Sequence, residues 1–304
     1  MTSIAIWGSH AQRFVERHAT ARVVAVFSRS FHLEAEGDFI CIGDPSIGRG
    51  PLNAVLGPAG WMRLATALPP IGTNARTALG AIHIGGITLD TTHAERWRPA
   101  PWPSAVRRKG VLQTLQRLQC LATEQAPVDG LARTVLGAAG DQRSALARVA
   151  QPRVGRLRAW VTARPSASAG APPPVDLLGL GPGLTPSGDD VLCGMLVALH
   201  AVGWTDVVHE LYAEIARAAP SATSAISAAF LRAAAEGLGC EALHAAIAAI
   251  LEGRIEALAG RVETLGRIGH TSGWDALAGA LLVLQAFGTT DGHRAGVARA
   301  WISE

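Results

Sequence analysis

The residues with the clearest chemical potential lie in one short turn, residues 180–190, which read LGPGLTPSGDD. The turn combines glycines and prolines with two hydroxyl side chains and two adjacent carboxylates, and an apolar run over 191–199 follows it directly. Glycine lets backbone N–H groups approach a ligand closely, and the first turn of a helix supplies N–H donors that have no partner within the helix. The sequence therefore predicts a ligand-binding loop that leads into a buried helix.

The glycines and hydroxyls of this turn are candidate substrate- or anion-binding residues: Gly181, Gly183, Thr185, Ser187 and Gly188. The carboxylates, Asp189 and Asp190, are candidate catalytic residues. Because carboxylates repel an anion, two alternatives stay open. A cation or an arginine could bridge carboxylate and anion, or the carboxylates could accept hydrogen bonds from an N–H-bearing substrate such as a carbamoyl group.

A purely structural explanation of the same turn is helix capping. Thr185 could cap the helix with Pro186 as its first residue, or Ser187 could cap it while Asp190 closes a capping box. Capping accounts for one hydroxyl and one carboxylate. It leaves the glycines and the second carboxylate without a role, and we therefore favour ligand binding.

A second turn, residues 269–275 with the sequence GHTSGWD, also precedes an apolar helical segment. His270 and Asp275 are candidate catalytic residues here, and Thr271 and Ser272 are candidate substrate-binding residues. Two such helix starts in one helical domain could converge on one pocket. The alternative is that a hydroxyl only caps the helix, Asp275 interacts favourably with the helix dipole, and His270 is structural.

Two further features are weaker candidates for substrate binding. Ser224 and Ser227 lie three residues apart, on one face of an expected helix, and could line the same pocket or pack closely between alanine-rich helices. Arg49 lies between two glycines, where a guanidinium could pair with a carboxylate or a phosphate, although an exposed turn is the alternative. The chain has no Walker A loop and no dinucleotide fingerprint.

The expected fold class is α+β, with four segments. A β-rich part over 1–103 contains short β-branched runs and a hairpin signal at Gly85–Gly86, and it is followed by a helical connection over 104–163. A proline- and alanine-rich linker is expected over 164–175, and an α-helical domain over 176–304. That domain should contain about six helices, with breaks near Gly203, Pro220, Gly237, Gly253 and Gly269.

Composition narrows the class of protein. Hydrophobic residues make up 49% of the 304 residues, which is enough to form a sizeable core, and the formal net charge is +3. The longest basic run is residues 107–109, so we do not expect nucleic-acid binding. Apolar runs fall short of a membrane span and no secretory signal is evident, so we expect a cytoplasmic protein with free thiols. The four cysteines follow no zinc spacing, and no metal site is expected, with Mg²⁺ only as a candidate bridging cation.

Three segments occur in a characteristic order: 179–190 (GLGPGLTPSGDD), 224–231 (SAISAAFL) and 269–275 (GHTSGWD). Together they resemble a bacterial family long labelled as a domain of unknown function. Its members lie beside FdrA-type subunits in ureide (allantoin) breakdown, and it is linked to the AllH-type subunit of oxamate carbamoyltransferase. The resemblance covers most of the chain, is strong over 179–288 and is looser before residue 100.

The resemblance implies a reaction in purine catabolism: oxalurate and phosphate give oxamate and carbamoyl phosphate, or the reverse. It implies FdrA-type and other carbamoyltransferase subunits as partners; a homo-oligomer is also open. In this reading the glycine turn holds a phosphate or carboxylate, Asp189 or Asp190 orients the carbamoyl nitrogen or a cation, and Arg49 reaches a substrate carboxylate. The chain lacks the Ser-Thr-Arg-Thr type loop of ordinary carbamoyltransferases, so its site would differ.

Two other functions stay open at the level of sequence. One is a non-catalytic subunit that binds a small anion and serves assembly or regulation. The other is a metal-dependent hydrolase that uses the pair of aspartates, although the lack of a histidine-rich ligand set argues against zinc.

Overall fold

The computed structural model describes residues 2–106, 108–137, 144–163, 172–289 and 300–301. The chain divides into two compact units, Met1–Pro99 and Ala100–Glu304. Most of the linker expected over 164–175 falls on residues 164–171, which lie outside the described residues. No helix among the described residues is long and apolar enough to cross a membrane.

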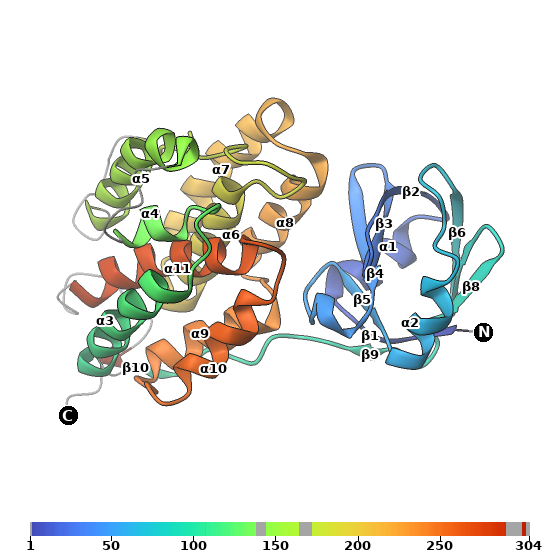
Figure 1. Ribbon diagram of the computed structural model, residues 1–304, viewed down its shortest axis with the longest axis horizontal. Coiled ribbons are helices and arrows are strands. Elements are labelled where there is room, and N and C mark those ends of the chain that lie inside the picture. Colours follow the sequence, from blue (N-terminus) through green and yellow to red (C-terminus); the bar gives the residue numbers. More distant parts are fainter. Residues whose placement is uncertain (1, 107, 138–143, 164–171, 290–299, 302–304) are drawn as a thin grey trace. The chain divides into compact units, whose positions relative to one another are not determined.

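The first unit is a closed barrel of eight strands (Figure 1). The strands are β1 (Thr2–Trp7), β2 (Thr20–Val26), β3 (Ser30–Ala35), β4 (Asp38–Gly43), β5 (Asn53–Leu56), β6 (Asn74–Ala78), β7 (Ala81–Ile84) and β8 (Ile87–Asp90). Their order around the ring is β1-β5-β4-β3-β2-β6-β7-β8, and the ring closes because β1 pairs antiparallel with β5 and parallel with β8. A short strand, β9 (Glu95–Arg96), pairs with the end of β1.

The barrel corrects the expected fold. The broad α+β class fits, but a merely β-rich N-terminal part is wrong, because the strands form one closed barrel. The hairpin at Gly85–Gly86 is confirmed, since β7 and β8 pair with Ile84 opposite Ile87. Closure itself depends on pairings of β1 with strands far along the chain, and a local pattern of hydrophobic residues carries no information about such pairings.

The interior of the barrel is filled by apolar side chains that alternate along the strands, as expected for a barrel of this size. The fully buried ones include Val23, Phe31, Leu33, Ile40, Ile42, Ile82, Ile84 and Leu89. Two helices, α1 (Ser9–Arg17) and α2 (Pro58–Ala65), and a 3-10 turn, η1 (Pro45–Ile47), connect strands of the ring. The barrel is therefore a packed core and not a channel.

The second unit is helical. Its helices are α3 (Arg108–Gln125), α4 (Ala132–Leu136), α5 (Ala145–Ala163), α6 (Ser187–Val202), α7 (Thr205–Ala222), α8 (Ala225–Ala235), α9 (Glu241–Leu251), α10 (Leu258–Gly266) and α11 (Ser272–Thr289). A two-residue strand, β10 (Ala105–Val106), pairs in parallel with β11 (Ala300–Trp301). Figure 1 shows α6 and α11 side by side in the middle of this unit, and most of their residues are buried.

The six helices expected after residue 176 correspond to α6–α11. Four of the expected breaks are confirmed, because Gly203, Gly237, Gly253 and Gly269 all have positive φ angles. The break near Pro220 is also present, since α7 ends at Ala222, two residues after the proline, and α8 begins at Ala225.

Two glycines allow α6 and α11 to pack with their backbones in contact. A Cβ atom at Gly194 would lie 1.7 Å from the carbonyl oxygen of Ala276, and one at Gly279 would lie 1.9 Å from that of Val191. Any side chain at either position would therefore push the helices apart. This crossing fixes the distance between the first turns of the two helices, which carry the candidate site.

Candidate functional site

The glycine loop that precedes α6 owes its shape to glycines with positive φ angles, namely Gly179 (+75°), Gly181 (+123°) and Gly183 (+95°). The helix begins at Ser187 with Pro186 as its N-cap, and no side chain caps it. Both capping alternatives for this turn are thus wrong. Gly188 is required for a different reason, because a Cβ atom there would lie 1.9 Å from the carbonyl oxygen of Leu177.

The first turns of α6 and α11 meet through their hydroxyl side chains. Thr185 Oγ1 lies 3.4 Å from Ser272 Oγ, and Ser187 Oγ lies 3.4 Å from Thr271 Oγ1. The structure thus brings together four of the candidate residues from two segments more than eighty residues apart. We call these four residues, Thr185, Ser187, Thr271 and Ser272, the hydroxyl cluster.

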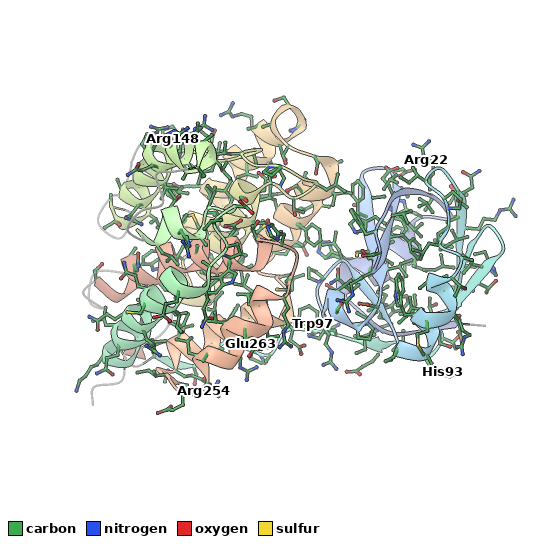
Figure 2. The ribbon with its side chains drawn as sticks, viewed as in Figure 1. Arg22, His93, Trp97, Arg148, Arg254 and Glu263 are labelled. Carbon is green, nitrogen blue, oxygen red and sulfur yellow. The ribbon has the colours of Figure 1, made fainter. Side chains whose placement is uncertain are left out.

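Two buried aspartates, Asp189 and Asp275, and the half-buried Asp190 adjoin the hydroxyl cluster, whereas charged side chains such as Arg148, Arg254 and Glu263 are exposed on this unit (Figure 2). The first aspartate, Asp189, is fully buried and accepts hydrogen bonds with both carboxylate oxygens. The donors are the backbone N–H of Gly179 (2.6 Å), the hydroxyl of Ser227 (2.6 Å) and the hydroxyl of Thr223. Asp189 therefore fastens the glycine loop to the junction between α7 and α8.

The serines of α8 contact the same loop. Ser224 is the N-cap of α8, where its hydroxyl accepts a hydrogen bond from Ser227 N at 3.0 Å and donates one to the carbonyl oxygen of Leu184 at 2.5 Å. Ser227 donates to Asp189. Both serines thus support the loop, and their contacts in the structure are with protein groups.

The second aspartate, Asp275, is also fully buried. Its Oδ1 accepts hydrogen bonds from the backbone N–H groups of Leu131 (2.7 Å) and Ala132 (2.8 Å), at the start of α4. Burial raises the pKa of Asp275, and hydrogen bonds from Ser187, Leu131, Thr271 and Ala132 oppose that rise. A glycine at position 130 is needed for this contact, because a Cβ atom there would lie 2.7 Å from Asp275 Oδ1.

The third aspartate, Asp190, has an incomplete set of partners. Ser272 forms a hydrogen bond with its carboxyl group, but among the described residues Oδ2 is buried and has no hydrogen-bond partner. Burial raises the pKa of Asp190 well above its usual range, the bond from Ser272 opposes this, and the nearby carboxyl groups of Asp275 and Asp189 raise it further. Asp190 therefore holds its proton more tightly than an exposed aspartate does.

Two cysteines next to Asp190 were not among the candidates. Burial raises the pKa of Cys193 well above its usual range, with Asp190, Asp189 and Cys240 adding to the rise, and burial raises the pKa of Cys240 to about 11. A thiol reacts as a thiolate, so these two cysteines are poor nucleophiles at neutral pH. All four cysteines of the chain are free.

His270 and Arg49 are the two remaining candidate residues. His270 forms an exposed pair with Asp129, with 3.2 Å between Nε2 and Oδ2. Arg49 belongs to the barrel unit, between η1 and β5. The cluster and its three aspartates are built from the helical unit alone. Within the described ranges, no group of three or more His, Cys, Asp or Glu side chains is arranged to hold a metal ion.

The raised pKa of Asp190 predicts how stability changes with pH. Below the ordinary aspartate value of 3.8 the carboxyl group is protonated in both folded and unfolded chains. As the pH rises above that value, the unfolded chain loses the proton while the folded chain keeps it. The free energy of unfolding therefore falls until the pH passes the folded pKa.

The variant Asp190→Asn cannot titrate and should not show this fall. We expect the free energy of unfolding of Asp190→Asn, minus that of the wild type, to increase with pH over the same window. Urea unfolding at a series of pH values measures the difference, and Asp206→Asn, at an exposed position in the first turn of α7, is the control. If the free energy of unfolding changed with pH in the same way for the wild type and for Asp190→Asn, the raised pKa of Asp190 would be refuted.

One family model matches a stretch of the chain that contains both helix starts. Residues 177–284 match the model of the family described as oxamate carbamoyltransferase subunit AllH. The match confirms the family resemblance inferred from the three motifs, over a narrower stretch than expected, about a third of the chain. It contains the glycine loop, α6 and most of α11. No solved structure matches the chain.

Proposed function

We propose that this chain, whose residues 177–284 match the AllH family, is a subunit of an oxamate carbamoyltransferase-type enzyme. The reaction would convert oxalurate and phosphate into oxamate and carbamoyl phosphate, or the reverse. The observation that carries the proposal is the meeting of the first turns of α6 and α11 at the hydroxyl cluster, inside the matched stretch. The partners proposed for the assembled enzyme are FdrA-type and other carbamoyltransferase subunits.

The chemistry of the cluster suits a small, oxygen-rich anion. Oxamate and oxalurate present carboxylate and carbonyl oxygens, which are acceptors, and hydroxyl groups can donate to them. The loop backbone adds N–H donors, and the start of α6 adds the positive end of a helix dipole. A Cβ atom at Gly183 would meet nothing within 4 Å, so the backbone at this part of the loop is open to a ligand.

The candidate residues then divide by what they contact. Thr185, Ser187, Thr271 and Ser272 would bind the substrate, and Asp190 and Asp275 would act beside them. The bonds of Asp189 suggest that it holds the glycine loop in place. For Arg49 and His270 we retain the roles that the sequence suggested, binding a substrate carboxylate and carrying a proton. Preorganised donors of this kind stabilise charge that develops during a transfer reaction.

The decisive experiment is to measure carbamoyl phosphate formation from oxalurate and phosphate. The chain would be assayed alone and after co-purification with the subunits encoded by neighbouring genes. We expect activity in the complex and little or none with the chain alone. A well-assembled complex without activity would reject the proposed reaction.

Within the active complex, Ser272→Ala should lower kcat/KM by about tenfold, because it removes one hydroxyl that faces both Thr185 and Asp190. Asp206→Asn should leave kcat/KM unchanged, since that side chain is exposed on α7. If Ser272→Ala weakened assembly but left turnover per assembled complex intact, the cluster would belong to a non-catalytic, anion-binding subunit instead.

A further inference from the structure

The buried Oδ2 atom of Asp190 points to what the site binds. A buried polar atom without a hydrogen-bond partner is costly, and native proteins leave few of them. Among the described residues Asp190 Oδ2 has none, although the adjoining hydroxyl cluster contains four hydroxyl side chains. A ligand could provide the missing partner. The chemical class of that ligand depends on whether the carboxyl group of Asp190 accepts a hydrogen bond from it or donates one to it.

The groups around Asp190 decide between these two cases. The titratable side chains that interact electrostatically with it are Asp189 on the same helix, Asp275 on α11, Cys193 one turn further along α6, and Cys240 at the start of α9. All of these are acidic groups, and no basic side chain in the described part of the chain forms an ion pair with Asp190.

Asp189 already accepts three hydrogen bonds, which is the behaviour of an ionised carboxylate. A second negative charge on the adjacent residue, buried and without a cation, would be strongly unfavourable. Two adjacent carboxyl groups in unequal environments commonly take different protonation states. Here three hydrogen-bond donors bind Asp189, so Asp189 is the ionised carboxylate and Asp190 is the carboxyl group that keeps its proton.

We propose that Asp190 carries its proton and that its buried carboxyl group donates a hydrogen bond to an oxygen atom of the substrate. The site would then select a carboxylate or carbonyl oxygen and reject a cation. This inference rests on the proposed function of the same site and assigns Asp190 a role in binding. It also explains how two adjacent aspartates can stand at the start of a helix that binds an anion, because only one of them is charged.

The protonation state can be measured without any ligand. A protonated carboxyl group has an infrared C=O stretching band that an ionised carboxylate lacks. We expect such a band in the full-length wild-type protein at neutral pH, its loss in Asp190→Asn, and its retention in Asp206→Asn. Identical carboxyl regions in the wild-type and Asp190→Asn spectra would show that Asp190 is ionised, and would overturn the proposal.

The role in binding requires a second measurement, with oxamate as the probe in calorimetric titrations. Asp190→Asn keeps a neutral donor of the same shape, so we expect its affinity to stay within about threefold of the wild type, whereas Asp190→Ala should bind about tenfold more weakly or worse. The wild-type affinity should fall as the pH rises through the pKa of Asp190, and the affinity of Asp190→Asn should not. MgCl2 should leave all these affinities unchanged.

Three results would contradict the donor role. They are oxamate binding by Asp190→Ala equal to that of the wild type, binding by Asp190→Asn about tenfold tighter because a repelling charge has gone, and binding that requires magnesium. Failure of the wild type to bind oxamate would likewise overturn the choice of substrate oxygen. Oxamate binding with the expected pattern, but without carbamoyl transfer in an assembled complex, would reject the proposed function and leave the inference standing.

Discussion

Gly194→Ala is expected to lower the free energy of unfolding of the helical unit by about 3 kcal/mol or more. The added methyl group would lie 1.7 Å from the carbonyl oxygen of Ala276, which is backbone and cannot rotate away. The helices α6 and α11 would have to separate, and the hydroxyl cluster would open with them. Urea unfolding followed by the helical circular dichroism signal measures the loss, and carbamoyl transfer in the complex should fall in parallel.

The matched control is Gly155→Ala, in the middle of α5. This glycine is exposed, and a Cβ atom there would meet nothing within 4 Å. Because alanine is the better helix former, Gly155→Ala should stabilise the unit by about 0.5–1 kcal/mol. If Gly194→Ala were as stable as Gly155→Ala, the close backbone crossing of α6 and α11 would be wrong.

Asp189→Asn is expected to cost roughly 3 kcal/mol of stability and to lower carbamoyl transfer more than a hundredfold. Both oxygens of Asp189 accept hydrogen bonds, from Gly179 N, Thr223 and Ser227. An asparagine in either orientation turns its NH2 group toward at least one of these donors. The glycine loop would lose its attachment to the α7–α8 junction, and its N–H groups would no longer be held for a ligand.

The comparison of Asp189→Asn with Asp190→Asn tests whether the adjacent aspartates differ as the structure indicates. The first substitution should unfold the loop, whereas the second keeps the shape and the neutral state of the side chain. Unfolding experiments and hydrogen exchange at residues 179–188 report the difference, with Asp206→Asn as the surface control. Equal and small effects from both substitutions would contradict the contacts assigned to Asp189.

The sequence identified the two helix starts and left open whether they converge, because each start carries its own local signal, glycines and hydroxyls directly before an apolar run. It could not separate the two aspartates. Neighbouring side chains on a helix point about 100° apart, so Asp189 faces α8 while Asp190 faces Ser272 on α11. Whether a side chain that points in one of these directions finds hydrogen-bond donors depends on how the other helices pack. The local sequence around the aspartates does not contain that information.

The partners of Asp275 were missed for the same reason. Its carboxylate is bound by the backbone N–H groups of Leu131 and Ala132, more than 140 residues earlier in the chain. A backbone N–H donor is present at almost every residue, so no residue type identifies the ones that bind Asp275. The one residue type that the contact requires is glycine at position 130, and the chain has 34 glycines. Barrel closure was missed in a similar way, since β1 meets β5 and β8 only in the folded chain.

The ring of eight strands has a consequence for how the first unit can associate with other proteins. Each strand of the ring has a neighbour on both sides, so none offers the free backbone edge on which strand addition and edge-to-edge aggregation depend. Exchange of a strand between two copies would first require the ring to open. Contacts made by the ring strands must therefore use side chains, whereas the two-residue strand β9 pairs, among the described residues, only with β1. Met62, Ile71 and Leu79 are the most exposed large apolar residues of this unit.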